Sequence, residues 1–349
     1  MATVSKERAG YGRLLAGGAL AFALLVGLVL SLDAAAILDA LATADPPLVA
    51  LAAALSLLAQ LCWSLTTTTI LAGVDASLPT RRIQLGYLSG TFGKQVLPLG
   101  NAGGSAILAY VISEDLDRRF RDVFAAVTAS ELLVFAGSVG VAIIGLIAVL
   151  LNPYSGLPTT LVLALLTAIV LVTVVTGAVV AYRIHVVATV VERVAWLLRA
   201  TLGTVSVRVH RSLAPGRVRS GTESFLAAFG TATGETRRLV VAATVAVLGW
   251  LAFSAALYVG LLAVGASIPL GLALFLTPAA GVVTLLPTPG GLGSTEIGLT
   301  AAISLLVATP PAVAAAGVIV FRLVTYWLVV AAGGLASLYL SATVWHALD

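Results

Sequence analysis

Charged residues are scarce in this sequence. Only 10% of its 349 residues are Asp, Glu, Lys or Arg, whereas 60% are hydrophobic. Soluble domains carry about 25% charged residues, which cover the surface that faces water. The uncharged runs Leu14–Leu32 and Pro46–Val74 are long enough to cross a hydrocarbon core, which takes roughly 20 apolar residues. The composition therefore excludes an ordinary soluble domain and predicts an all-α polytopic membrane protein.

Residues that build disulfides, metal sites and nucleotide sites are also missing. Cys62 is the single cysteine, which excludes an intrachain disulfide. His185, His210 and His346 are too scattered to form a metal-ligand spacing. The sequence has no G-x-x-x-x-G-K-[ST] signature for nucleotide phosphates. We therefore predict no metal, no cofactor and no catalytic residue.

The basic residues are unevenly distributed and indicate an orientation. Lys6, Arg8 and Arg13 precede the first apolar run, and nine arginines lie between Arg183 and Arg238, the one long polar segment. Because Lys and Arg are enriched in cytoplasmic loops, we expect this segment and both termini on the cytoplasmic side of the cell membrane. The net charge of +4 then indicates loops that face anionic lipid rather than a nucleic-acid site. Within the loop, VVATVVERVAWLLRATL predicts an amphipathic helix on the membrane surface.

Proline and glycine interrupt two apolar runs. Ile83–Ser113 contains LPLGNAGGS (Leu97–Ser105), and Leu270–Val307 contains LLPTPGGLGSTE, which ends at Glu296. Three arginines follow the first run, so we expect two limbs that enter from the cytoplasmic side and return to it, whereas the second run enters from outside. Full spans are predicted near residues 14–32, 46–74, 123–151, 159–182, 239–264 and 314–340. The expected architecture is therefore six full spans plus two re-entrant or broken helix pairs.

The two interruptions resemble each other. Each begins with Leu-Pro and ends with glycine and serine; Glu131 lies 33 residues after Pro98, and Arg322 lies 35 residues after Pro287. Opposite entry sides are typical of an inverted-topology repeat, which places broken helices around a substrate site near the bilayer midplane. We predict one transmembrane domain over residues 1–349, with repeats at about 47–151 and 239–342 and a cytoplasmic connector at 183–238. Two unrelated kinks are the alternative.

Four charged residues fall inside apolar runs, namely Lys94, Glu131, Glu296 and Arg322. Each costs at least about 2.5–3.5 kcal/mol at a helix centre unless it is paired or hydrated, so we expect a polar cavity in which they pair or contact substrate. Arg322 and Lys94 suit a phosphate group, and backbone amides freed at the breaks favour an anion. The predicted substrate-binding residues are Lys94, Pro98, Asn101, Glu131, Pro287, Pro289, Gly290, Gly291, Glu296, Arg322 and Tyr326.

Two other interpretations of these charges stay open. In the first, the four charges pair only to hold helices together. In the second, Glu296 only caps the helix that follows it. Gln60 and Gln95 are further candidates for the cavity wall, whereas Thr66–Thr69 are expected to hydrogen-bond to their own helix.

Three motifs resemble one known family. PLGNAGG after Gly93–Lys94, LLPTPGGLGSTE, and FRLVTYW with a following Gly-Gly look like the lysylphosphatidylglycerol synthase transmembrane family, the flippase-like domain. The resemblance covers about residues 13–342 and implies an inverted-repeat membrane fold. It also implies translocation of lipids such as aminoacylated phosphatidylglycerol, or attachment to glycosyltransferases that act on polyprenyl-phosphate sugars. The family often has a Glu-Arg pair where this chain has Glu131-Leu132, so Glu131 corresponds only loosely.

The sequence favours a transporter over an enzyme. The soluble aminoacyl-transferase and glycosyltransferase domains of larger family members are not found in these 349 residues. We expect a flippase that moves an anionic phospholipid or a polyprenyl-phosphate-linked lipid, with the lipid head group and membrane lipids as partners and no nucleic acid. Alternatives are a membrane transferase that uses Glu296 or the outer acidic loop (Asp33, Asp39, Asp45), and a membrane anchor for a soluble enzyme. A homo-oligomer also stays open.

Overall fold

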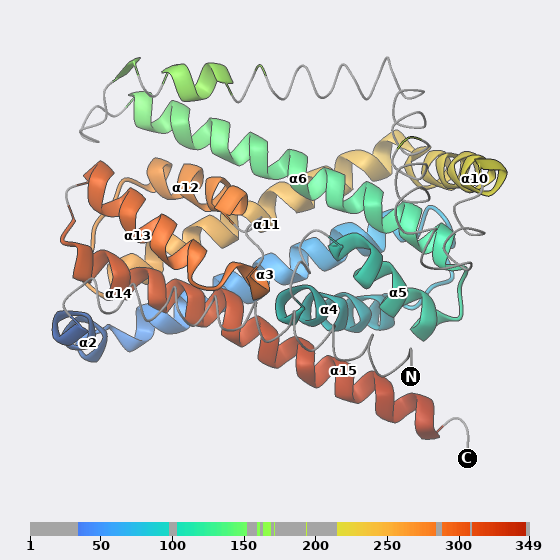
Figure 1. Ribbon diagram of the computed structural model, residues 1–349, viewed down its shortest axis with the longest axis horizontal. Coiled ribbons are helices and arrows are strands. Elements are labelled where there is room, and N and C mark those ends of the chain that lie inside the picture. The colour runs from blue at the N-terminus through green and yellow to red at the C-terminus, as the bar shows by residue number, and fades with distance from the viewer. Residues whose placement is uncertain are drawn as a thin grey trace.

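The computed structural model describes residues 34–97, 103–151, 215–283, 288–307 and 309–346, with a few positions between 159 and 193. Within these ranges every regular element is a helix, as the composition predicts. Figure 1 shows the long helices running roughly side by side along the longest axis of the molecule.

Four long helices form the body of the bundle. They are α3 (Pro46–Leu71), α6 (Phe120–Leu151), α11 (Thr236–Ala263) and a last helix that joins α14 (Pro311–Arg322), the π-helical η3 (Leu323–Trp327) and α15 (Leu328–His346). All four are long and apolar enough to cross a membrane, since a helix rises about 1.5 Å per residue and the hydrocarbon core is about 30 Å thick. They coincide with four of the predicted spans, which confirms a multi-pass membrane protein. The predicted span 14–32 and most of 159–182 lie outside the described residues.

Two pairs of shorter helices contain the breaks. α4 (Thr80–Val96) and α5 (Gly104–Leu116) lie in the right half of Figure 1. α12 (Leu270–Val283) and α13 (Ser294–Val307) lie in the left half, with the short turn η2 (Pro289–Gly291) near the middle. Each pair therefore enters from its own end of the bundle and returns to that end. Residues 289–307 form a fifth segment long and apolar enough for a span, but they reach from the middle of the bundle to its left end.

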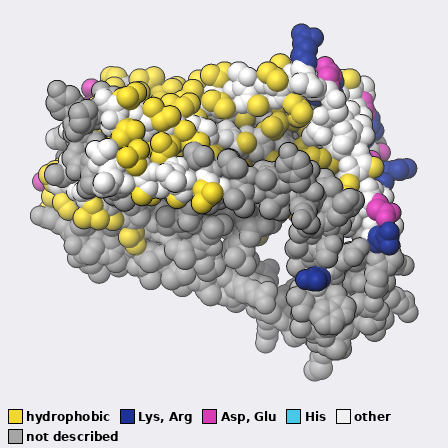
Figure 2. Space-filling view, turned by 90° about the horizontal axis from the view of Figure 1, so that it is seen from above, with side chains coloured by type: hydrophobic (Ala, Val, Ile, Leu, Met, Phe, Trp, Pro, Cys, Tyr) yellow, Lys and Arg dark blue, Asp and Glu magenta, His cyan; other side chains and the backbone are white. Residues whose placement is uncertain are grey.

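Arginine side chains gather at one end of the molecule. That end contains the start of α4 with Arg81 and Arg82, the turn after α5 with Arg118, and helix α10 (Pro215–Thr233), seen almost end-on in Figure 1. In Figure 2 the dark blue side chains of the visible face also lie toward this end, whereas hydrophobic side chains cover the middle. The arginines of the described residues are therefore concentrated at one end of the helix bundle.

Two segments expected as loops are helical. Residues 34–42 form helix α2 instead of an outer loop, because Ile37 packs against Ala315 and Ala316 of α14. Residues 215–233 of the expected cytoplasmic loop form α10, whose Phe225 ring lies 5.5 Å from that of Phe124 in α6. The segment VVATVVERVAWLLRATL, predicted as an amphipathic helix, lies almost entirely outside the described residues.

Small residues allow the helices to pack closely. A Cβ added to Gly249 of α11 would lie 2.6 Å from the indole nitrogen of Trp63 in α3, and one added to Gly271 of α12 would lie 2.9 Å from the carbonyl oxygen of Gly145 in α6. Close backbone approach replaces the hydrophobic effect as a source of helix association in lipid. α12 packs on α6, and in the same way α4 packs on α15.

Candidate functional site: a cavity between two ion pairs

The ion pair between Glu296 and Arg322 is the more deeply buried of two pairs near the middle of the bundle. Arg322 Nε donates to Glu296 Oε1 at 2.8 Å, and the two side chains are 10% (Arg322) and 4% (Glu296) exposed. Arg322 Nη2 donates to the carbonyl oxygen of Gly290 at 2.9 Å, and the guanidinium carbon lies 4.7 Å from the centre of the Tyr326 ring. The second break therefore contributes both a carboxylate and a backbone carbonyl to the surroundings of Arg322.

The local sequence explains how Glu296 and Arg322 meet. Gly290, Gly291 and Gly293 have φ values of 53°, 68° and 81°, a region that glycine enters without a steric cost from Cβ. The chain turns there and starts α13 at Ser294, which places Glu296 in the first helical turn, where the helix dipole favours a carboxylate. Glu296 is thus both a helix-end carboxylate and the partner of a buried cation. A π-helical turn directly follows Arg322, and such turns are frequent at functional sites.

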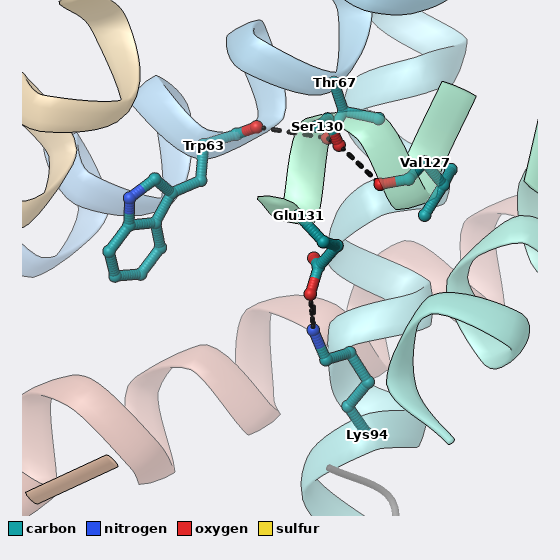
Figure 3. A network of polar contacts seen from close by, with 6 residues as sticks. All are labelled: Trp63, Thr67, Lys94, Val127, Ser130 and Glu131. Carbon is teal, nitrogen blue, oxygen red and sulfur yellow. Dashed lines mark hydrogen bonds and ion pairs between the residues drawn. The ribbon is translucent and has the colours of Figure 1, made fainter. Parts of the chain in front are cut away.

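Lys94 and Glu131 form the second ion pair, which is less buried. Lys94 Nζ, near the end of α4, donates to the two carboxylate oxygens of Glu131 in α6 at 3.2 and 3.0 Å. Their side chains are 19% (Lys94) and 28% (Glu131) exposed. Figure 3 shows Lys94 and Glu131 pointing toward each other, while Ser130 turns to Thr67 of α3, with 3.0 Å between the two hydroxyl oxygens. Each interrupted element therefore pairs with the long helix that follows it in sequence.

A cavity of about 290 Å³ lies against both ion pairs, because Lys94, Glu131 and Arg322 all line it. One water molecule needs about 10–15 Å³ of such space, so the cavity has room for a polar group much larger than water. The two breaks meet at its wall. Tyr326 Oη donates to the carbonyl oxygen of Gln95 at 3.4 Å, and a Cβ on Gly290 would collide with the side chains of Gln95 and Tyr326.

Several polar atoms in the cavity wall have no partner within the described part of the chain. They are Gln60 Oε1, Trp63 Nε1 and Thr295 Oγ1, and all three side chains belong to buried residues. A buried polar atom is normally hydrogen-bonded to protein, water or ligand. Both donors and acceptors are therefore available to a molecule that enters the cavity.

Aromatic side chains form an apolar part of the same cavity wall. Trp63 of α3 and Trp250 of α11 have ring centres 5.2 Å apart, and Phe253 lies 5.2 Å from Trp63 and 5.3 Å from Phe321. Trp250 Nε1 donates to the carbonyl oxygen of Val134 in α6 at 2.7 Å, so this ring is fixed, whereas Trp63 Nε1 has no such partner. The cavity thus combines ionic, neutral polar and aromatic surfaces.

The structure brings together the predicted site residues that it describes. Lys94, Glu131, Gly290 and Arg322 line the cavity, and Glu296 and Tyr326 contact Arg322. Pro289 and Gly291 form the η2 turn on either side of Gly290. The remaining three predicted residues lie outside the described residues, namely Pro98, Asn101 and Pro287.

Two minor predictions from the sequence are also confirmed. Gln60 and Gln95 line the cavity. Thr66–Thr69 donate their hydroxyl hydrogens to the carbonyl oxygens four residues earlier. Each threonine therefore bonds within its own helix, as expected, while Thr66 and Thr67 also contact Ala242 and Ser130 of other helices.

Sequence reasoning missed the aromatic wall and Thr91. Trp63 and Trp250 lie well inside their long helices, whereas membrane tryptophans are enriched at the two interfaces. A tryptophan near the centre of a predicted span could therefore have indicated a residue of the cavity wall. Phe253, Phe321 and Thr91 gave no signal, because such residues are ordinary in apolar helices.

Comparisons with known proteins identify the family of this chain. The sequence model of the lysylphosphatidylglycerol synthase transmembrane region matches residues 14–333. A UPF0104 membrane protein of Methanothermobacter thermautotrophicus is 26% identical over 325 residues, which are 92% of this chain and 93% of the relative. Residues 14–333 include both breaks and the four charges Lys94, Glu131, Glu296 and Arg322. The chain therefore belongs to the lysylphosphatidylglycerol synthase transmembrane family.

Proposed function

We propose that this protein is a lipid flippase. It binds the phosphate-bearing head group of an anionic phospholipid or of a polyprenyl-phosphate-linked lipid in the cavity, while the lipid chains stay in the bilayer. The family description names an aminoacylated phospholipid, which supports lipid as the substrate class. The observation that carries the proposal is the convergence of Lys94, Glu131 and Arg322 on one cavity near the middle of the bundle.

The cavity has donors for phosphate oxygens. A guanidinium has five N–H donors, and the bonds from Arg322 to Glu296 and Gly290 use two of them within the described residues. Lys94 is partly exposed, and Trp63 Nε1 is an unpartnered neutral donor in the same wall. Phosphate suits Arg because the planar guanidinium presents parallel N–H groups. The two carboxylates keep the four-charge cluster neutral, so a phosphate enters without facing a net negative cavity.

The similar order of elements in the two halves supports the predicted inverted repeat, and with it transport by alternating access. Both halves have the same order of elements, a long helix, two short limbs and a second long helix. Trp63 lies 35 residues before Pro98, Trp250 lies 37 before Pro287, and the two rings touch. The packing of α6 on α12 corresponds to that of α15 on α4. Inverted repeats of this kind expose a fixed central site to either side by rocking one half against the other.

The same features give an orientation and weaken the alternatives. The arginine-rich end faces the cytoplasm of the cell because Lys and Arg are enriched in cytoplasmic segments, and α15 ends on that side in Figure 1. A transferase would use Glu296, but this carboxylate is buried and bound to Arg322. Asp45 of the outer segment accepts a bond from the backbone N–H of Leu48 at 3.4 Å, as the N-cap of α3. Neither carboxylate is placed for acid–base chemistry at the membrane surface.

A lipid translocation assay tests the proposal. The protein is reconstituted in liposomes with fluorescent phosphatidylglycerol or phosphatidylcholine, and the fraction accessible to a membrane-impermeant reductant is followed over time. The variant Lys94→Met/Glu131→Gln removes one ion pair without leaving a lone charge. The matched control Asp75→Asn/Arg118→Gln removes a 2.9 Å ion pair at the arginine-rich end, away from the cavity.

We expect wild type and control to translocate phosphatidylglycerol at the same rate and the cavity variant to be at least several-fold slower. Phosphatidylcholine should move more slowly than phosphatidylglycerol through the wild-type protein. Equal rates for wild type and cavity variant, or no translocation above that of empty liposomes, would overturn the proposal.

A further inference from the structure

We infer that Glu296 is a proton-binding site that couples lipid translocation to proton movement. When a phosphate group binds Arg322, Glu296 loses its cation and binds a proton, which arrives along α13 from the end of the bundle opposite the arginines. The inference rests on the proposed function, because it needs a phosphate head group in the cavity.

The first observation is an unpartnered oxygen on a buried carboxylate. Arg322 bonds to Glu296 Oε1, whereas Oε2 has no partner within the described residues, and the residue is 3% exposed. Glu131 differs, because Lys94 donates to both of its oxygens. Of the two carboxylates, only Glu296 has an oxygen that is both buried and free to accept a proton.

The second observation is a row of unpartnered hydroxyls on the same helix. Thr300 and Ser304 follow Glu296 at intervals of four residues, which places all three on one face of α13, and both hydroxyl oxygens are buried without a partner. Hydroxyls in membrane helices commonly donate to the carbonyl four residues earlier. Thr277 and Thr325 of the cavity wall do so at 2.8 and 2.7 Å. Thr300 and Ser304 are therefore exceptions whose buried hydroxyls have no hydrogen-bond partner within the described residues.

The row points from the cavity toward one side of the membrane. Glu296 and Ser304 are eight residues apart, or about 12 Å along a helix. In Figure 1, α13 runs from the middle of the bundle to the end opposite α10. Buried water commonly bridges polar groups that have no protein partner, and the proposal requires a chain of such waters along Thr300 and Ser304 to connect Glu296 with that end.

Competition for Arg322 links the phosphate to the proton. Phosphate first meets the N–H groups of Arg322 that Glu296 and Gly290 leave free, and in this proposal it then competes with Glu296 for the single positive charge and displaces it. A buried carboxylate without a cation is too costly to stay ionised. Its oxygen takes a proton that is relayed from bulk solvent along the row of hydroxyls, so one negative charge on the phosphate and one proton enter together. When the phosphate leaves, Glu296 releases its proton and the ion pair between Glu296 and Arg322 forms again. Uptake and release are thereby tied to binding and release of lipid.

The other charged and titratable groups around Glu296 do not replace it in this role. Arg322 and Tyr326 face it from the last long helix, and Lys94, Glu131 and Tyr87 line the same cavity from the first half. Within the described residues, α12 contains no charged side chain, and Arg322 is the only one in α14.

Proton uptake on lipid binding is the direct test. Short-chain phosphatidylglycerol is titrated into the detergent-solubilised protein in weak buffer with a pH-sensitive dye, and bound lipid is measured in parallel by calorimetry. Linkage predicts uptake of about one proton per bound lipid for wild type and none for Glu296→Gln. Glu131→Gln is the matched control, with weaker binding but the same uptake per bound lipid. Lipid binding by wild type without proton uptake would overturn the inference, whether or not the Glu296→Gln variant folds.

A pH gradient across proteoliposomes tests the direction of coupling. Wild type should accumulate fluorescent phosphatidylglycerol in one leaflet under the gradient, and Glu296→Gln should equalise the leaflets instead. Thr300→Val/Ser304→Ala should reach the wild-type distribution several-fold more slowly, because only the path to Glu296 has changed. If the distribution of lipid between the leaflets did not depend on the pH gradient in wild type, the inference would be wrong, and the proposed flippase function would still stand. No lipid movement at all would sink the proposed function itself.

Discussion

The two ion pairs beside the cavity use the same chemistry in opposite arrangements. In the first half the interrupted element carries the cation, Lys94, and the following long helix carries the anion, Glu131. In the second half the interrupted element carries the anion, Glu296, and the long helix carries Arg322. The first pair is 19% and 28% exposed, whereas the second is 10% and 4% exposed. The halves therefore differ in burial as well as in the order of charge.

This difference in burial indicates that the two ion pairs have different roles. Arg322 has a backbone carbonyl and an aromatic ring as additional partners, so it is fixed in place. Lys94 is bound by Glu131 alone within the described residues, and a flexible ammonium group on a partly exposed chain changes partners easily. We therefore expect the first pair to respond to an arriving head group and the second to hold the second break in shape until phosphate reaches Arg322.

The largest expected effect is that of Arg322→Ala on stability. The change leaves the Glu296 carboxylate buried without a cation, which costs about 3–5 kcal/mol. Lys94→Ala should cost only about 0.6–1.7 kcal/mol, as for membrane hydrogen bonds in general, because Glu131 is partly exposed. Thermal unfolding of both variants in the same detergent measures the difference. Equal losses would mean that burial does not separate the two pairs.

Gly290→Ala should have the next largest effect, and it compares the two breaks directly. Gly290 has a φ of 53°, and a Cβ there would collide with Tyr326 and Gln95. Strain and overpacking together cost about 2–4 kcal/mol. Gly103, next to the first break, has a φ of −104° and no atom within 4 Å of an added Cβ, so Gly103→Ala should cost less than about 1 kcal/mol. Urea titration of the two variants would contradict this prediction if Gly103→Ala were the less stable.

Exchanging the two charges within each pair should affect the stability of the two ion pairs differently. Lys94→Glu/Glu131→Lys should recover most of the stability that either single change removes, because each partner needs only an opposite charge. Glu296→Arg/Arg322→Glu should recover little. The first turn of α13 favours a carboxylate, and the Gly290 carbonyl and Tyr326 ring require a cation. Double-mutant cycles measure both coupling energies, and similar recovery at the two sites would refute the asymmetry.

An ion pair outside the cavity should matter least. Hydrogen bonds from the side chain and backbone of Ser77, with help from Arg118, hold the pKa of the Asp75 carboxyl below its usual value. A lowered pKa stabilises the folded state above the ordinary Asp pKa of about 4. This contribution is lost as the pH falls through the folded-state value. Asp75→Asn should therefore lower the melting temperature slightly at neutral pH and not in strong acid; a larger loss in acid would contradict the assignment.

Much of this architecture could be predicted because its signals are local. Proline and glycine mark both breaks, and uncharged runs mark α3, α6, α11 and the last helix. The four charges stand out because each is costly in lipid. Helices α2 and α10 could not be predicted as reliably, since they depend on packing against α14 and α6 rather than on their own apolar pattern.

The sequence alone determined the membrane class, the two interruptions and which charges are buried, because hydropathy and chain breaks are properties of short segments. Only the tertiary structure decided that Lys94 pairs with Glu131 and Glu296 with Arg322, over separations of 37 and 26 residues. It also decided that Trp63 and Trp250 face one cavity. The physical reason is helix rotation: which side of an apolar helix turns inward depends on where small residues let two backbones approach, and that is a property of pairs of helices.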